Sequence, residues 1–296
     1  MLIQLCRKVL TDQVNNVRAL RTIHTTVVNK TFWEKEKKSG YAQKYPLTSK
    51  KMILDGLKEF KSELNLWKEE MKEKFESDPI LVFRPGEIDV IWKFSEEQDL
   101  DKWVVTSDKD HNQGLSVASF ERSPAGFGLF SGNLSSELPI DGRIKKAGYC
   151  NIKSMRQRKS FKRETSFDWS TYNTLVMRVR GDGRPYLINL SCEAYHDMTW
   201  NDIYHYILYT RGGPHWQVTK IPFSKFFYAS KGRVQDKQVA FPVDRVTSVG
   251  FSVSGRAGYD GNFSLEVDYI GLEFDPHETE DFAYETYKVD KYIVQT

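Results

Sequence analysis

The chain has 296 residues, of which 40% are apolar, and a formal net charge of +3. That length allows one large domain or two small ones with a sizeable core, whereas so small a charge does not by itself indicate a nucleic-acid-binding protein. The sequence has no run of about 18 apolar residues, the length that spans a membrane, and its three cysteines form no CxxC pair, so neither a disulfide framework nor a zinc site is expected.

The first thirty residues are basic and amphipathic. Apolar residues recur at helical spacing at Leu10, Val14 and Val17, and the only acid is Asp12. The basic residues of the segment are Arg7, Lys8, Arg18, Arg21 and Lys30. An arginine-bearing, acid-poor start is typical of a mitochondrial transit peptide, so we expect residues 1–30 to be one, cleaved between residues 21 and 30. The alternative is a disordered basic tail.

Residues 31–80 are predicted to form a polar linker followed by one amphipathic helix. An apolar stripe steps along the helix by four, three, four, three and four residues. The stripe consists of Ile53, Leu57, Phe60, Leu64, Trp67 and Met71. Such a helix either pairs with a partner helix or packs against its own domain. Because about five turns are short for an autonomous coiled coil, we favour packing against the chain's own domain.

From residue 81 to residue 275 the pattern changes to short strands. The candidate strands are Val90–Phe94, Trp103–Ser107, Leu115–Glu121, Gly126–Gly132, Gly148–Ser154, Thr174–Arg180, Tyr186–Glu193, Tyr204–Thr210, Trp216–Ile221, Ser248–Ser254 and Phe263–Phe274. In one of them Val249, Phe251 and Val253 alternate with small or polar residues, which indicates one buried and one solvent-facing side. Many short strands with regularly spaced turns predict an antiparallel β-sandwich or jelly roll.

Residues 174–191 are predicted to form a β-hairpin near the centre of this region. Two alternating apolar runs flank residues 181–185, which contain glycine, aspartate and proline. Arg180-Gly181-Asp182 spells an integrin-binding tripeptide, but the same residue types are expected of a turn. Because the N-terminus does not resemble a secretory signal, we interpret this segment as a turn.

No catalytic residue, metal site or cofactor site is predicted. The sequence has neither a phosphate-binding loop nor an HExxH zinc motif, and its six histidines lack metal-ligand spacing. Glu266 and Asp268 share a strand face and could form an acid–base pair. Their alternation with apolar residues predicts instead that both are exposed to solvent. The sequence therefore favours a protein that is not an enzyme.

A basic run without any acid is the first of two candidate binding surfaces. It consists of Arg143, Lys145, Lys146, Lys153, Arg156, Arg158, Lys159, Lys162 and Arg163. Such a run can contact an anionic membrane surface or an acidic partner, and it is equally compatible with a solvated connection between strands.

The second candidate surface is aromatic. Trp200 and Trp216 lie in a segment rich in tyrosine, and exposed aromatic side chains serve both sugar-binding platforms and protein interfaces. A place in the sandwich core and its rim is the favoured interpretation. Residues 276–296 are expected to form an acidic, aromatic C-terminal tail.

Four long motifs occur in order along the second half of the chain. They are NTLVMRVRGDGRPYLINL, YTRGGPHWQVTKIPFSKFF, SVGFSVSGRAGYDGNFSLEVDYIGLEFDP and HETEDFAYETY. Together they resemble the mitochondrial complex I intermediate-associated proteins of thirty kilodaltons, from about residue 90 to residue 287. Before residue 79 the resemblance is limited to the type of segment: a presequence followed by a charged segment.

This resemblance implies a galactose-binding-like β-sandwich and a non-enzymatic role as an assembly chaperone of respiratory NADH:ubiquinone oxidoreductase (complex I). It places the protein in the mitochondrial matrix, peripheral to the inner membrane. The implied partners are complex I intermediates and subunits, an acyl-CoA-dehydrogenase-like protein, a signalling-adaptor homologue and small membrane assembly proteins, with no nucleic acid and no cofactor. The alternative from the residues alone is a carbohydrate-binding β-sandwich module, and a matrix enzyme using Glu266 and Asp268 is a third hypothesis.

Overall fold

The structure is a computed structural model and describes most of the chain between residues 36 and 284. The described ranges are 36–38, 41–42, 49–76, 84–95, 97–138, 147–193, 202–230, 232–255 and 259–284. The predicted transit peptide, Arg143, Lys145, Lys146, Trp200 and residues 285–296 lie outside them, as do the side chains of Ile53 and Lys162.

The chain divides into two compact units, Met1–Glu59 and Phe60–Thr296. In the first unit, β1 (Glu36–Lys38) and β2 (Tyr41–Ala42) form a two-stranded antiparallel ladder. Helix α2 (Ser49–Glu76) begins in this unit and ends in the second. The predicted helix is therefore present. Among the described residues, no helix is both long enough and apolar enough to cross a membrane.

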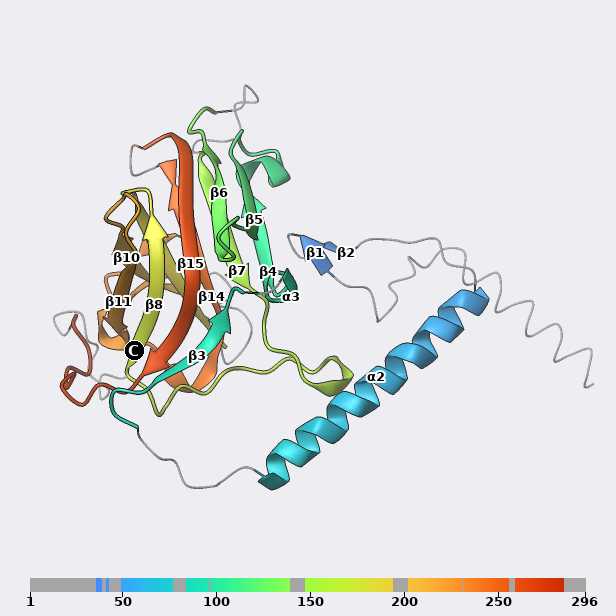
Figure 1. Cartoon of the computed structure of the whole chain (residues 1–296). Helices are drawn as coiled ribbons and strands as arrows, with labels where there is room; N and C mark the ends of the chain where they lie inside the picture. The colour runs from blue at the N-terminus through green and yellow to red at the C-terminus, as the bar shows by residue number, and fades with distance from the viewer. Residues whose placement is uncertain are drawn as a thin grey trace, which may run out of the picture. The chain divides into compact units, whose positions relative to one another are not determined.

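The second unit is a β-sandwich of two antiparallel sheets, and Figure 1 shows β15 beside β8 at the front of it. In spatial order the seven-stranded sheet consists of β13 (Arg233–Val234), β12 (Phe227–Ser230), β10 (Asp202–Tyr209), β9 (Pro185–Cys192), β14 (Val246–Ser254), β7 (Tyr149–Ser154) and β4 (Trp103–Ser107). The six-stranded sheet consists of β11 (Gln217–Pro222), β8 (Thr174–Gly181), β15 (Gly261–Glu273), β6 (Gly128–Leu134) and β5 (Val117–Arg122), with β3 (Ile88–Lys93) paired to β15.

Short helical elements connect the strands. They are α3 (Glu97–Leu100) and the 3-10 turns η1 (Asp108–His111), η2 (Ser160–Lys162), η3 (Phe223–Lys225) and η4 (Val243–Arg245).

The core lies between the sheets and is built from the alternation that predicted the strands. Ile188 and Leu190 of β9 and Phe251 of β14 are fully buried, as are Leu265 and Val267 of β15. Each such strand buries every second side chain because successive side chains point to opposite faces of a sheet. The predicted antiparallel β-sandwich is confirmed.

The predicted hairpin at residues 174–191 is wrong in its pairing. β8 pairs with β11 and β15 in one sheet, whereas β9 pairs with β10 and β14 in the other. The turn between them therefore carries the chain from one sheet to the other. Alternation identifies each strand and its buried face, but it does not identify the neighbour with which that strand pairs.

The described start of the C-terminal tail packs on the sandwich. Phe282 is buried, the amide of Ala283 donates to the carbonyl of Ser224 over 3.1 Å, and the hydroxyl of Tyr284 donates to the carbonyl of Lys225 over 3.2 Å. Two strands of the seven-stranded sheet, β12 and β13, were not predicted, because at four and two residues they are too short to show a period.

Candidate partner-binding surface

The apolar stripe of α2 is exposed along much of its length. We call its described side chains, Leu57, Phe60, Leu64, Trp67 and Met71, the helix ridge. Leu57 is 61% exposed, Phe60 54% and Trp67 42%, while Leu64 and Met71 are half-buried. The expectation that this stripe packs against the chain's own domain is therefore wrong for Leu57, Phe60 and Trp67. Large apolar side chains left in water on one line mark an interaction site.

Two glutamates in the second half of the helix accept hydrogen bonds from elsewhere in the second unit. They contact residues 158–163 of the β7–β8 connection, which we call the clasp loop. Glu63 accepts a hydrogen bond of 2.6 Å from the amide of Phe161. Glu70 accepts from the amide and the hydroxyl of Ser160, and from the Arg163 guanidinium over 2.6 Å.

The electrostatics of this contact favour the ionised form of Glu70. The hydrogen bonds from Ser160 and the neighbouring Arg163 charge hold the pKa of the Glu70 carboxyl below its ordinary value. Neither Glu63 nor Glu70 was predicted from the sequence to make a contact. Their spacing of seven residues places them on one side of the helix, which is the signal that could have identified them.

Phe161 is the strained residue of the clasp loop. Its φ of 55° lies in the left-handed region, which costs a residue with a Cβ about 1–2 kcal/mol. Its amide is held by Glu63, and its ring, which is 46% exposed, lies 6.2 Å from the ring of Phe60. The contact thus extends the exposed apolar surface from the helix onto the loop.

A shallow groove of about 310 Å³ runs between the last turns of α2 and the clasp loop. Trp67 and Met71 of the helix ridge line it, and charged side chains of the helix and of the loop, including Lys74 and Lys159, surround them. An apolar floor with a charged rim is the composition found at the centre and edge of protein interfaces.

The basic run does not form one uniform cationic surface in the described part of the chain. Arg156 pairs with Glu164 and Glu193 at 3.0 Å and 2.6 Å. Arg158 lies 3.9 Å from Glu63, and Arg163 lies 2.6 Å from Glu70. Lys153, on β7, and Lys159, in the clasp loop, are exposed. Three arginines of the basic run therefore lie beside acids of the same chain. Two of these acids, Glu63 and Glu70, are on α2.

Trp216 is half-buried on the outer side of the six-stranded sheet. The guanidinium carbons of Arg178 and Arg180 lie 4.8 Å and 5.0 Å from its ring centroid, and the ring of Phe127 packs on it edge-on at 4.7 Å. Two arginines on one indole form cation–π contacts. This ring is engaged within the fold and does not form an open platform.

The same arginines correct the expectation for Glu266 and Asp268. Arg178 donates to Asp268 over 2.5 Å, and Arg180 donates to Glu266 through Nε over 2.6 Å. Each acid side chain is only 13% exposed. The two carboxylates share a strand face as predicted, but they are not solvent-exposed. Each carboxylate is paired with an arginine of β8 within the fold.

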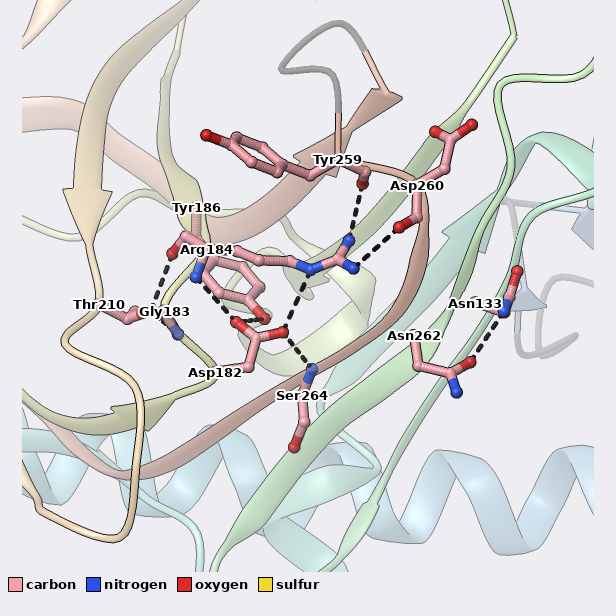
Figure 2. A network of polar contacts seen from close by, with 10 residues as sticks. All are labelled: Asn133, Asp182, Gly183, Arg184, Tyr186, Thr210, Tyr259, Asp260, Asn262 and Ser264. Carbon is pink, nitrogen blue, oxygen red and sulfur yellow. Dashed lines mark hydrogen bonds and ion pairs between the residues drawn. The ribbon is translucent and has the colours of Figure 1, made fainter.

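The turn between β8 and β9 is fixed by a polar network, which Figure 2 shows. Asp182 accepts hydrogen bonds from the amide of Arg184, the hydroxyl of Tyr186 and the amide of Ser264, each of 3.1 Å. The Arg184 guanidinium donates to the carbonyls of Tyr259 and Asp260, over 2.7 Å and 3.1 Å. The Arg180-Gly181-Asp182 tripeptide is thus part of the fold, and its aspartate is occupied by the chain's own donors.

A second polar row crosses the outer side of the seven-stranded sheet. The Nδ1 atom of His205 lies 2.7 Å from Oδ1 of Asn189, whose amide nitrogen donates to Ser252 over 3.0 Å. Burial lowers the pKa of His205 to about 4. The imidazole is therefore neutral near pH 7. Among the described residues, no group of three or more side chains is arranged to hold a metal ion.

The chain is similar to a known protein family and to several of its members. A protein-family model described as "Complex I intermediate-associated protein 30 (CIA30)" matches residues 92–267. "Complex I intermediate-associated protein 30, mitochondrial" of Drosophila melanogaster is 63% identical over 275 residues, which cover 93% of each chain. The protein of the same name from Mus musculus is 46% identical over 200 residues, which cover 66% of this chain and 59% of the mouse protein.

Solved structures show a weaker likeness. The family 11 carbohydrate-binding module of the cellulase Lic26A-Cel5E of Clostridium thermocellum has a TM-score of 0.45 and 13% identity, over 65% of this chain and 98% of the module. At that level no inference about a ligand follows. The family match and the two relatives confirm the resemblance stated from the four motifs: this chain belongs to the complex I intermediate-associated protein 30 family, whose relatives named here are mitochondrial.

Proposed function

We propose that this protein is a non-enzymatic assembly chaperone that holds intermediates of mitochondrial complex I through the helix ridge and the clasp loop. Membership of the family implies a role in assembly. The observation that carries the binding role is the exposure of Leu57, Phe60 and Trp67 along one line of α2. A protein that had no partner there would lose nothing by having polar residues at these positions.

The site of action in this proposal is the matrix side of the inner membrane. The relatives are named mitochondrial, and the first thirty residues have the composition of a transit peptide. The partners expected from the family resemblance are complex I intermediates and subunits, an acyl-CoA-dehydrogenase-like protein, a signalling-adaptor homologue and small membrane assembly proteins. Exposed lysines such as Lys153 and Lys159 would add attraction to an anionic membrane or an acidic subunit.

The test is complementation of a cell line that lacks the protein. The line should contain less complex I and should accumulate subcomplexes on native gels, and the wild-type chain should restore assembly. Leu57→Ser with Trp67→Ser should fail to restore it, because the substitutions remove apolar contact area from the helix ridge. Normal complex I in the line without the protein would refute the proposal.

The helix offers a matched control for this experiment. Leu66 lies off the ridge and off both of its flanks, and it is 44% exposed, close to the 42% of Trp67. Leu66→Ser therefore removes exposed apolar area from another side of the same helix and is the matched control for Trp67→Ser. We expect Leu66→Ser to restore assembly; if it fails as Trp67→Ser does, the ridge is not the binding surface.

The carbohydrate-binding alternative receives less support from the geometry. A sugar-binding platform presents an open aromatic face, whereas Trp216 is contacted by Arg178, Arg180 and Phe127. A glycan array tests the carbohydrate-binding alternative. Saturable binding that is lost on Trp216→Ala would favour it over an assembly role.

A further inference from the structure

The two flanks of the helix ridge carry opposite charges. The ridge residues recur in alternating steps of four and three, which is the 3.5-residue repeat of a two-helix coiled coil. In that repeat Glu63 and Glu70 fall on one side of the seam, and Lys61 and Lys68 fall on the other. Such flanking positions determine the choice and the direction of a partner helix.

The clasp loop occupies the acidic flank and contacts the ridge at Phe60 through the ring of Phe161. Glu63 and Glu70 accept their hydrogen bonds from Phe161, Ser160 and Arg163, as described above. Lys61 and Lys68 are exposed, and neither has an ion-pair partner in the described part of the chain. The clasp loop therefore holds α2 mainly through the two acids, and the exposed part of the ridge and the lysine flank are left for another molecule.

From this arrangement, and resting on the proposed assembly role, we infer that α2 pairs as a coiled coil with an amphipathic helix of another protein that carries acids beside its apolar seam. Carboxylates at the facing flank positions would pair with Lys61 and Lys68, while apolar side chains fill the spaces along Phe60, Leu64 and Trp67. Opposite charges at these positions attract the partner and penalise helices with basic flanks.

Two other occupants fit the charges less well. Helix α2 carries seven lysines and seven acids, so it has no net charge with which to bind an anionic membrane, unlike the lysine-rich helices that lie on such surfaces. A second copy of the chain would have to offer Glu63 and Glu70 to the lysines, but the clasp loop already holds both.

The direct test uses the full chain and two synthetic peptides in fluorescence anisotropy. Each peptide is a helix of 28 residues, the length of α2, with leucine along a heptad seam. One has glutamate and the other lysine at the flanking positions. The glutamate peptide should bind about tenfold more tightly, since two ion pairs are exchanged for two like-charge contacts.

A charge swap makes the test specific. Lys61→Glu with Lys68→Glu should reverse the preference between the two peptides, because it exchanges attraction for repulsion at the same positions. The lysines are exposed, so the variant should fold, and its thermal melting curve checks this. Equal affinity for both peptides, or a preference that the swap leaves unchanged, would overturn the inference.

Two further measurements test the competing occupants, an anionic membrane and a second copy of the chain. Sedimentation with phosphatidylcholine vesicles that contain phosphatidylserine, lost on Trp67→Ser, would assign the ridge to a membrane. Sedimentation velocity of the full chain would reveal a dimer that Leu57→Ser with Trp67→Ser dissociates. Either result would overturn the inference, and the absence of both agrees with it.

An experiment in mitochondria separates this inference from the proposed function. A photo-cross-linker at position 61, compared with one at Ser62 on the helix face turned away from the seam, should give a cross-linked peptide whose sequence is an acid-flanked amphipathic helix. If Lys61→Glu with Lys68→Glu supports full complex I assembly while loss of the protein does not, the assembly role stands and the helix inference fails.

Discussion

The sandwich and helix α2 use the same kinds of apolar side chain in opposite ways. Phe251 of β14 is fully buried between the sheets, whereas Phe75 at the end of α2 is 84% exposed. Both belong to regular apolar patterns that the sequence displays clearly. A pattern thus identifies which face of an element is apolar, but the structure is needed to show whether the chain itself covers that face.

Phenylalanine truncation tests this contrast and has the largest expected effect. Phe251→Ala should lower the free energy of unfolding by about 3–5 kcal/mol, because it leaves a cavity beside Trp103 in the core. Phe75→Ala should change it by less than about 0.5 kcal/mol. Chemical denaturation of both variants measures the difference, and comparable losses would show that the end of α2 is covered in solution.

The network at the turn between the sheets is expected to have the next largest effect. Asp182→Ala leaves the amides of Arg184 and Ser264 and the hydroxyl of Tyr186 without their acceptor. The free energy of unfolding should fall by about 2–3 kcal/mol, because hydrogen-bond donors that lose their acceptor are costly to leave unsatisfied. The exposed Asp236 provides the matched control, since Asp236→Ala should be nearly neutral. Equal effects of the two substitutions would mean that the network adds no stability.

His205 makes the stability of the sandwich depend on pH. Its pKa is about 4 in the folded protein and about 6.5 in an unfolded chain. Between these values the unfolded chain binds more protons, so stability falls as the pH decreases from about 6.5 to 4, by at most about 1.4 kcal/mol per pH unit. His205→Asn should reduce this slope in urea titrations at several pH values, and a slope equal to that of the unchanged chain would contradict the prediction.

Neutralising Glu70 should have the smallest effect, confined to the clasp loop. Glu70→Gln weakens the bonds to Ser160 and Arg163, so protection of the Ser160 amide from hydrogen exchange should fall about fivefold. The exposed neighbour Glu69 is the control. Because the pKa of Glu70 is lowered, this stabilisation is present at neutral pH and disappears only as the pH falls through that lowered pKa.

Local pattern was sufficient to predict the longer strands and the helix. The alternation of Val249, Phe251 and Val253 and the stripe of α2 both correspond to real elements. What failed depends on partners distant in the sequence. The carboxylates of Glu266 and Asp268 were expected in solvent, because nothing near them indicates that β8 brings Arg180 and Arg178 alongside.

Dependence on distant partners also explains why the contact between α2 and the clasp loop was not predicted. Glu63 and Glu70 are separated from residues 158–163 by about ninety positions, and charged residues on a helix are most often simply solvated. The basic run was identified, but its role in holding α2 depends on a contact that the spacing of the arginines does not encode.

The position of β15 has a consequence for the order in which the protein can fold. This strand, residues 261–273, is the last of the sandwich along the chain, and it pairs with β3, β6 and β8. A chain delivered N-terminus first, from a ribosome or through a translocation pore, would therefore keep the edges of three strands unpaired until almost its whole length has emerged. Unpaired strand edges readily join other chains, so folding of the sandwich should depend on holding the nascent chain apart from its neighbours until β15 arrives.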